Sequence, residues 1–566
     1  MRVVPDERLI DTVRASVIGA AEAIATPFGV RRVTYADYTA SGRAVSFIED
    51  LIRDAVLPLY ANTHTESSGT GLQTTRFRED ARAIIREAVG ANPEEHVVLF
   101  CGSGSTGAIH TLIDCLELRI PAGLDDRYGL TAAIPDVERP VVFIGPYEHH
   151  SNELPWRESI AYLVTVPEDQ DGRIDLATLE RELIAHAGRS VKIGSFSAAS
   201  NVTGIRSDVR AISVLLHRYG ALSCWDFAAA APHVDIEMSP RRGPVDPEFD
   251  HKDAMFISPH KFVGGPGTPG VLVARRELFR NRVPSVPGGG TVAYVNPSEH
   301  RYLDDIEHRE EGGTPAIVES IRAGLVFQLK DAVGTEAIRA REASFTHRAM
   351  HRWEENPEIE ILGSHDLPRL SIVSFVVRHR ERYLHHNFVV ALLNDLFGIQ
   401  ARGGCSCAGP YGHRLLGIDL DRSHEFEREI AKGCDGIKPG WVRVNFNYFL
   451  TEAVFGYVLD AVDLVATHGW RLLPRYRLDP PTGMWRHVGG QPEPPMSLLD
   501  VRYEGGEMVF EGHRHRAPES ALARYLDEGR AILAEAPVPV AGAAPEVSED
   551  FEHLRWFWLP QEIGQG

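Results

Sequence analysis

The chain has 566 residues, too many for one compact core, so two or three domains are expected. Its 59 basic and 79 acidic residues give a formal net charge of -20, which argues against nucleic acid or an anionic membrane as a partner. No apolar run approaches the roughly 18 residues of a membrane-spanning helix. The six cysteines are too few for a disulfide framework, so the composition favours the reducing cytoplasm.

The N-terminal part of the chain predicts a helical segment followed by an α/β domain. Residues 1–30 include "DERLIDTVRASVIGAAEAIA", where charged residues lie among apolar ones, as in an amphipathic helix and not a signal peptide. Between about 95 and 276, short apolar runs such as "HVVLFC", "VKIGSFS" and "AMFIS" alternate with helical patterns. Strands buried on both faces and joined by helices indicate a mostly parallel sheet, whose ligands bind beyond the carboxyl ends of the strands.

The C-terminal part predicts a smaller α+β domain and an extension. The pattern from about 345 to 465 mixes strand-like "RLSIVSFVVR" with helix-like "NFVVALLNDLFG". Beyond Trp470 the composition becomes rich in proline, and "FEHLRWFWLP" gathers aromatic residues that indicate a tail docked on the body of the protein. We therefore predict domains at 1–30, 31–340, 341–469 and 470–566, the last of unknown role.

A lysine and a helix start follow two of the predicted strands. Lys261 in "SPHK" follows "AMFIS"; it is either a surface lysine before a loop or a lysine able to form a Schiff base with an aldehyde. In "CGSGSTGAIH", Ser105 and Thr106 open a helix after the strand "VVLF". A helix N-terminus with hydroxyl groups suits a phosphate, although many helices begin with such caps.

Three further polar residues follow other predicted strands. His149 in "EHHSN" could stack on a planar ring or could merely be hydrogen-bonded, and Asn201 follows "SFSAAS". Asp226 in "CWDFAAAA" ends a buried strand, where a carboxylate needs a partner to stay charged. A protonated pyridine nitrogen is one suitable partner.

Taken in order, "STGAIH", "EHHSN", "SNVTGI", "DFAAA" and "SPHK" resemble the class V aminotransferase family of fold-type I pyridoxal-phosphate enzymes. Within that family the similarity is greatest to cysteine desulfurases and selenocysteine lyases. It extends from "RRVTYADYTASGR" near residue 31 to the segment after "VRVNF" near residue 465. The resemblance implies a fold-type I α/β large domain with a mostly parallel sheet, a smaller α+β domain and pyridoxal 5'-phosphate as the cofactor.

The resemblance also implies roles for single residues. Lys261 would bond covalently to the cofactor, Asp226 would pair with its pyridine nitrogen, His149 would stack on its ring, and Asn201 would lie near its phenolic oxygen. The loop "PGGGTV" would carry Thr291 to the phosphate of a neighbouring subunit, which implies a homodimer, and "EGGTP" resembles another family landmark. Ala229 departs from the family, which usually has a glutamine or similar residue there, so a hydrogen bond to the cofactor would be missing. The residues expected around the phosphate are Ser105, Thr106, Ser258 and His260.

The stretch "ARGGCSCAGP" places two cysteines one residue apart. In the desulfurases the catalytic thiol follows an Arg-X-Gly turn and precedes an alanine, which makes Cys407 the nucleophile here. The same resemblance implies that Arg443, assisted by Arg402, binds the substrate carboxylate. The Cys-X-Cys pattern is also similar to molybdenum-cofactor sulfurases. The expected reaction removes sulfur or selenium from a cysteine substrate through a Cys407 persulfide, with a sulfur-acceptor protein as a further partner.

Four alternatives stay open. A zinc site or a strained Cys405–Cys407 disulfide would need a spacing or a geometry that is unusual for such sites, and we expect no metal. Both thiols could be incidental in an aminotransferase, epimerase or β-lyase of the same family, since the segment between Cys407 and Arg443 is longer than the family pattern. Ala229 would also fit a catalytically idle scaffold whose acidic extension binds a protein. The zinc ligands considered are Cys405, Cys407, His413 and Cys434.

Overall fold

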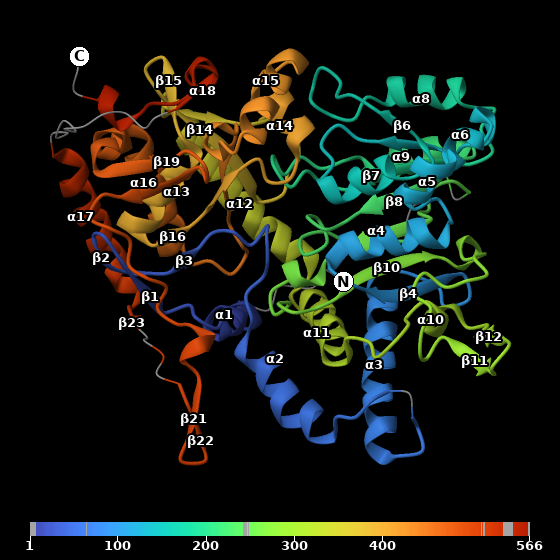
Figure 1. Cartoon of the computed structure of the whole chain (residues 1–566). Coiled ribbons are helices and arrows are strands. Elements are labelled where there is room, and N and C mark those ends of the chain that lie inside the picture. The colour runs from blue at the N-terminus through green and yellow to red at the C-terminus, as the bar shows by residue number, and fades with distance from the viewer. Residues whose placement is uncertain are drawn as a thin grey trace. The chain divides into compact units, whose positions relative to one another are not determined.

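The computed structural model describes residues 7–63, 65–240, 246, 248–510, 512, 515–535 and 547–563. The chain divides into two compact units (Figure 1). The first comprises Met1–Ile18, Thr39–Arg341 and Asp366–Leu370, and the second comprises Gly19–Tyr38, Glu342–His365 and Ser371–Gly566. The chain passes between them inside helix α12 (Thr335–Glu354), close to the predicted boundary at 340.

The first unit is built on a seven-stranded sheet that confirms the predicted α/β fold. Four neighbouring pairs are parallel, whereas β10 is antiparallel to both β4 and β9. Strands β5 ("VVFI") and β9 ("AMFI") are buried at every position, as expected for strands covered on both faces. In spatial order the strands are β4 (His96–Cys101), β10 (Gly270–Arg275), β9 (Ala254–Ile257), β8 (Leu222–Asp226), β7 (Lys192–Ser197), β5 (Val141–Ile144) and β6 (Tyr162–Thr165).

Helices surround this sheet and supply its crossover connections (Figure 1). Helices α3 and α11 pack closely because Gly324 has no side chain; a Cβ there would lie 2.7 Å from the Cβ of Ala81. Glu311 of the "EGGTP" landmark accepts from Arg78, Arg82 and the backbone N–H of Phe100, so its role is structural. The helices are α1 (Glu7–Ser16), α2 (Ser46–Leu51), α3 (Gly69–Ala88), α4 (Gly104–Cys115), α5 (Ala122–Tyr128), α6 (Leu130–Ala133), α7 (Leu154–Arg157), α8 (Leu176–Ala185), α9 (Val209–Arg218), α10 (Ile306–Arg309) and α11 (Ile317–Val333), and a hairpin joins β11 (Val292–Val295) to β12 (His300–Tyr302).

The second unit is built on a smaller antiparallel sheet. Its strands run in the order β13–β14–β18–β17, with β15 also paired to β14, and a separate parallel pair joins β3 to β16. The buried faces of α12, α13 and α16 share one hydrophobic core with this sheet. The elements are β3 (Thr34–Tyr35), β13 (Ile359–Ile361), β14 (Ile372–His379), β15 (Arg382–Leu384), α13 (His386–Phe397), β16 (Ile399–Gln400), β17 (Arg402–Gly404), α14 (Gly409–Leu415), α15 (Leu420–Ala431), β18 (Trp441–Asn445) and α16 (Glu452–His468).

The N-terminal helix is shorter than predicted. It ends at Ser16, and the chain then forms the hairpin β1 (Glu22–Thr26) and β2 (Gly29–Arg32) in place of the helix expected up to residue 30. Gly19 has a φ of 83° and Gly29 a φ of 107°, backbone conformations that end a helix and allow a tight turn. Pairing with distant β23 (His515–Arg516) adds hydrogen bonds that no local pattern reveals.

The C-terminal extension packs within the second unit. Trp485, Tyr525, Phe551 and Phe557 are buried in the core that also contains α13 and α16. The indole of Trp556 donates to the carbonyl of Ile437 at 3.1 Å, so the aromatic tail docks on the body as predicted. The elements of the extension are β19 (Tyr476–Asp479), β20 (Met484–His487), β21 (Arg502–Glu504), β22 (Glu507–Val509), β23, α17 (Leu522–Ala534) and α18 (Glu549–Leu554).

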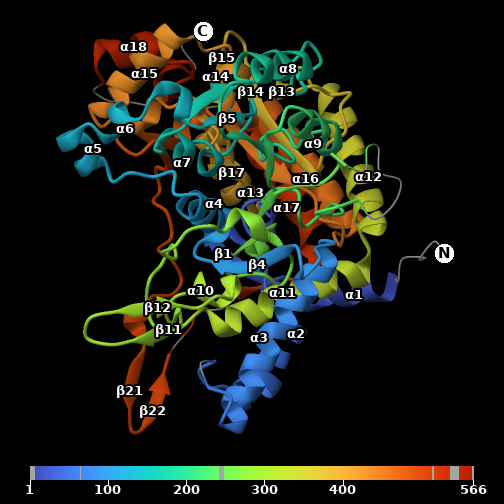
Figure 2. The same ribbon diagram turned by 90° about the vertical axis from the view of Figure 1, so that its right-hand side faces the viewer.

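Two features of the second unit lie at its surface. The segment after Cys407 folds as α14 and α15, and α15 meets the extension where Lys432 pairs with Asp550 at 2.9 Å. The hairpin β21–β22 extends away from the other elements of its unit (Figure 2), and its Tyr503 and Met508 are exposed. Across the described residues, no helix combines the length and the apolar character needed to cross a membrane.

Candidate active site

Lys261 lies in a short turn directly after β9 in the first unit. The turn η5 (Pro259–Lys261) follows the buried strand, and the backbone N–H of Gly42 donates to the carbonyl of His260 at 2.8 Å. A Cβ at Gly42 would lie 1.8 Å from the carbonyl oxygen of Phe262, so only glycine permits this approach. The backbone on both sides of Lys261 is therefore fixed by a neighbouring segment.

The N-terminus of α4 meets the residues before Lys261. The backbone N–H of Ser105 donates to the hydroxyl of Ser258 at 2.8 Å. Gly104 has a φ of +56°, and a Cβ there would lie 2.9 Å from that hydroxyl and 3.4 Å from Nε2 of His260. Burial and the charge of Lys261 lower the pKa of His260 to about 4, so its imidazole is neutral at pH 7. The cluster combines a helix N-terminus with hydroxyl and imidazole groups, as a phosphate site requires.

Asp226 ends β8 and belongs to the same site. Its carboxylate is buried and accepts from the backbone N–H of Ala228 at 2.8 Å. Burial raises the pKa of Asp226, while the N–H of Ala228, the charge of Lys261 and the hydroxyl of Ser105 favour the charged form. The raised pKa means that this carboxylate still lacks part of the stabilisation that a bound cation would give.

His149 is held in one tautomer by Ser151. The backbone N–H of Ser151 donates to Nδ1 of His149 at 3.1 Å, so in the neutral imidazole the proton is on Nε2. The hydroxyl of Ser151 also lies 2.7 Å from that of Thr106. Ser151 therefore connects His149 to the N-terminus of α4, a link that was not predicted although Ser151 belongs to the "EHHSN" motif.

Glu148 is a second residue that sequence reasoning missed. Its carboxylate accepts from the backbone N–H of Gly145 at 3.2 Å, from that of Ser197 at 2.9 Å and from Nδ2 of Asn152 at 2.6 Å. Burial raises its pKa to about 7. Glu148 thus joins the ends of β5 and β7 beside His149. The signal was a glutamate four positions after the end of a fully buried strand, because a buried glutamate needs several partners.

Three other predicted positions lie in turns beside strands of the first unit. Asn201 is buried in the turn after β7, where the hydroxyl of Ser200 accepts from the backbone N–H of Thr203 at 3.2 Å. Ala229 is buried in the turn after β8 and offers no polar side chain. Thr291 is not brought to the cluster: its buried hydroxyl donates to the carbonyl of Gly288 at 2.7 Å. A role for Thr291 at a neighbouring subunit stays a prediction.

The residues of the first unit fit pyridoxal phosphate. The site has an amine for the aldehyde, a buried carboxylate for the pyridine nitrogen and an oriented imidazole beside them. Gly104 and Ser105 place the start of a 12-residue helix against Ser258, with no side chain between. These groups match the aldehyde, the ring nitrogen and the phosphate of the cofactor.

Cys407 lies at the tip of a strained turn in the second unit. Ser406 and Cys407 have φ values of 51° and 54°, in the left-handed region that residues other than glycine rarely adopt. The turn is anchored by fully buried Ala408, whose N–H donates to the carbonyl of Cys405 at 3.1 Å. Both thiols are free, with Cys407 exposed and Cys405 half-buried, so the disulfide alternative is wrong for this structure.

The structure gives no support to a zinc site on the thiol loop. Among the described residues, the group of three potential ligands that converges is His217, His251 and Asp253. This group contains none of Cys405, Cys407, His413 and Cys434, and the absence of a metal there stays a prediction.

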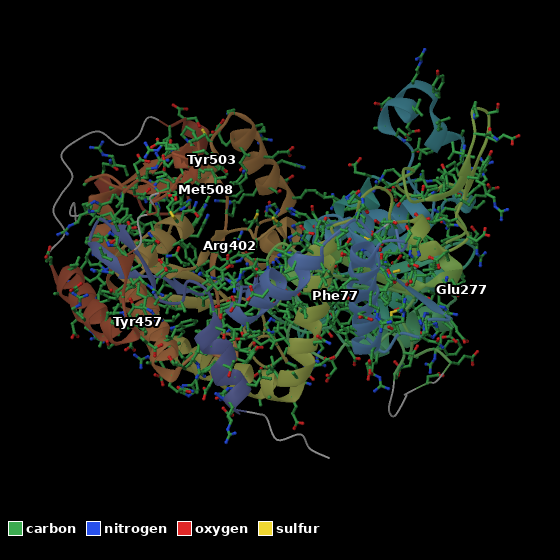
Figure 3. The ribbon with its side chains drawn as sticks, turned by 90° about the horizontal axis from the view of Figure 1, so that it is seen from below. Phe77, Glu277, Arg402, Tyr457, Tyr503 and Met508 are labelled. Atoms are coloured by element: carbon green, nitrogen blue, oxygen red, sulfur yellow. The ribbon has the colours of Figure 1, made fainter. Side chains whose placement is uncertain are left out.

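Arg402 and Arg443 face each other across β17 and β18, and Asp37 lies between them. Arg443 Nη2 is 3.0 Å from Asp37 Oδ1, and Arg402 Nε is 2.9 Å from Asp37 Oδ2. Arg443 is buried, whereas about half of the Arg402 side chain (48%) is exposed. Arg402 is labelled in Figure 3. Sequence reasoning placed both arginines at the substrate carboxylate but missed Asp37, although "YADYTA" began the family resemblance.

A mostly parallel sheet with a lysine after one strand, a carboxylate at the end of another and a phosphate-type helix start is the arrangement expected of a pyridoxal-phosphate enzyme. Residues 34–419 match the aminotransferase class-V family, and the chain belongs to this family, whose members are pyridoxal-phosphate enzymes.

Several relatives are cysteine desulfurases by name. The chain is 28% identical over 384 residues to a probable cysteine desulfurase of Streptomyces coelicolor, covering 67% of this chain and 84% of that protein. It is 26% identical over 430 residues to that of Halalkalibacterium halodurans, covering 75% and 95%. The solved cysteine desulfurase of Thermococcus onnurineus NA1 matches with a TM-score of 0.63 and 23% identity over 82% of this chain and 99% of that one. The Escherichia coli cysteine desulfurase CsdA matches with a TM-score of 0.60 and 20% identity over 80% and 97%.

These structural matches confirm the fold-type I prediction. The relatives do not bear on the similarity of the Cys-X-Cys loop to molybdenum-cofactor sulfurases.

Proposed function

We propose that this chain removes sulfur from L-cysteine with pyridoxal phosphate as its cofactor. The observation that carries the proposal is the free, exposed thiol of Cys407, held in a left-handed turn just after the strand that bears Arg402. The names of the similar proteins support the same reaction. Selenocysteine, whose reacting atom is the heavier analogue of sulfur, is a second substrate of the same proposal.

The first unit holds the cofactor in this proposal. Bound pyridoxal phosphate supplies an electron sink that weakens bonds at Cα and Cβ of the amino acid. Lys261 would hold the cofactor through its Nζ and, when free, could move the proton at Cα of the substrate. Asp226 would pair with the ring nitrogen, and His149, whose proton is on Nε2, would face the ring. Ser105, Thr106, Ser258 and His260 would bind the phosphate, and Asn201 would hydrogen-bond the phenolic oxygen.

The second unit supplies the nucleophile and the carboxylate clamp. The Cys407 thiolate attacks Sγ of the substrate cysteine, so that an S–S bond forms while the Cβ–Sγ bond breaks. The electron pair of the broken bond stays on the carbon fragment, which gains a proton and leaves as alanine. Cys407 is left as a persulfide, and its exposure gives a thiol of an acceptor protein access to the sulfur. Arg443, assisted by Arg402, binds the α-carboxylate through charge-assisted hydrogen bonds. A homodimer is part of the proposal.

Cys407→Ser tests the proposal, and Cys405→Ser is its matched control on the same loop. With L-cysteine and a reductant, wild type and Cys405→Ser should each release one sulfide for every alanine. Mass spectrometry of the wild type should show a peptide that carries one extra sulfur at Cys407. Cys407→Ser should lose alanine release by roughly 10³-fold or more, the scale expected when a nucleophile is removed.

Two results would contradict desulfuration. Sulfide released with pyruvate, unchanged by Cys407→Ser, would identify a β-lyase that needs no thiol. A wild type that carries the cofactor yet yields neither product would leave transamination, epimerisation or an idle scaffold as the function.

A further inference from the structure

Two arginines occupy directly opposed positions in the second unit. Arg402 of β17 and Arg443 of β18 are Cα partners in an antiparallel pair. Like charges directly opposite each other destabilise a sheet, because their side chains are close and share one face. Arg443 is also buried, and burial lowers its pKa. Such a pair needs an anion to remain stable.

Asp37 supplies that anion from a distant part of the chain. Its two carboxylate oxygens contact one arginine each, Arg443 at 3.0 Å and Arg402 at 2.9 Å. The backbone beside Asp37 is fixed on both sides. Asn445 of β18 accepts from the N–H of Tyr38 at 2.8 Å, and the N–H of Ala36 donates to Gln400 of β16 at 3.1 Å. The carboxylate is therefore held in place by two strands and has little freedom to leave the arginines.

The charges of the three side chains do not cancel. Two guanidinium groups and one carboxylate leave a single positive charge. Of the two arginine side chains, that of Arg402 is the more exposed to solvent. A substrate with one carboxylate neutralises this charge completely. A second anionic group on the substrate would find no further positive charge on these three side chains, and the fixed carboxylate of Asp37 would repel it, strongly because the site is partly buried.

We propose that Asp37 determines substrate class: it positions Arg443 and limits the site to amino acids with a single carboxylate and an uncharged side chain. The inference rests on the proposed function, in which Arg443 binds the α-carboxylate. Asp37 acts through the arginines and is a positioning residue. Its removal leaves two positive charges and favours dicarboxylic amino acids.

Asp37→Asn in the cofactor-loaded enzyme tests the inference, with L-alanine and L-aspartate as probes. Binding of each is measured by titrating the cofactor absorbance, and calorimetry provides a second readout. The wild type should bind L-alanine more tightly than L-aspartate. In Asp37→Asn the ratio of the two affinities should move toward L-aspartate by about tenfold or more, the effect of removing one close charge. Asp463→Asn, which loses a carboxylate paired with Arg352 at 2.7 Å in the same unit, should leave the ratio unchanged.

A double variant distinguishes charge from mere loss of structure. Asp37→Asn combined with Arg402→Gln restores a single positive charge and should return the ratio toward the wild-type value, which a disordered site could not do. An affinity ratio unchanged in Asp37→Asn, or one that the double variant fails to restore, would overturn the inference while leaving Cys407 chemistry intact. Failure of the wild type to bind either amino acid would instead remove the proposed function, and this inference with it.

Discussion

The two units place charge in opposite ways. In the first site, burial raises the pKa of the Asp226 carboxylate, and His260 is an uncharged imidazole with a pKa of about 4. In the second unit, Arg402 and Arg443 outnumber the carboxylate of Asp37. A buried site that lacks a countercharge is suited to retain a bound group, whereas an excess of charge at a half-exposed site suits a substrate that enters and leaves.

The backbones of the two sites also differ: glycines shape the site at Lys261, whereas residues with side chains form the turn at Cys407. Near Lys261, glycines such as Gly42 and Gly104 permit close approaches that fix the site at little cost. Near Cys407, two residues other than glycine have left-handed backbone conformations, which store strain in an exposed turn. The cofactor site is therefore built on close approaches that glycine permits, and the thiol site on a strained turn.

Lys261→Ala should have the largest effect, because Lys261 supplies the amine that bonds to the cofactor aldehyde in the proposed function. We expect loss of the visible band of lysine-bound cofactor and a fall in alanine release of roughly 10⁴-fold or more, the scale of losing a residue that bonds to the reacting group. Absorbance spectroscopy and a product assay measure both. Lys192→Ala, at the start of β7, is the control and should keep the band. An intact band in Lys261→Ala would show that the cofactor bonds elsewhere.

Much of the first site could be predicted from the sequence because its residues follow strands and open a helix. Lys261, Asp226 and Ser105 each come directly after a recognisable apolar run, and such ends meet at one edge of a parallel sheet. Asp37 could not be predicted, since it is 365 residues from Arg402 and 406 from Arg443. The hairpin after α1 was missed for a similar reason: its partner strand begins at His515.

Acid should weaken the second unit through two buried histidines at the start of α13. Burial lowers the pKa of His386 to about 3 and that of His385 well below its usual value. Below pH 6.5 these histidines are protonated in the unfolded chain but stay neutral in the folded protein. The free energy of unfolding therefore falls as the pH falls toward 3. Each histidine should lower the free energy of unfolding by about 1.4 kcal/mol for every pH unit in that window.

Urea unfolding at pH 7.5, 6 and 5, followed by tryptophan fluorescence, measures this slope. Trp556 stacks on His386 with ring centroids 5.8 Å apart, so its emission reports on this region. His386→Gln should reduce the slope of the unfolding free energy against pH by the equivalent of about one proton taken up on unfolding. Exposed His351→Gln should not change it. Equal slopes in the wild type and His386→Gln would mean that His386 takes up its proton without unfolding.

The smallest effect on stability is expected for substitutions of Ser406. They test whether the left-handed backbone at this position is strained. Glycine adopts a φ of 51° without steric cost but loses more backbone entropy on folding, so Ser406→Gly should change the free energy of unfolding by less than about 1 kcal/mol. A β-branched residue strongly disfavours a positive φ. Ser406→Val should therefore lower the free energy of unfolding by about 1–3 kcal/mol.

The informative readout of Ser406→Gly is the rate at which iodoacetamide modifies Cys407. If the strained turn holds the thiol in place, glycine should change that rate while stability stays constant. Gly104→Ala in the first unit is the matched case, because its Cβ would lie 2.9 Å from Ser258 Oγ and should lower cofactor affinity without affecting Cys407. A Cys407 rate identical in wild type and Ser406→Gly would show that residues outside the turn hold the thiol, and the contrast between a glycine-built site and a strained turn would then lose its functional meaning.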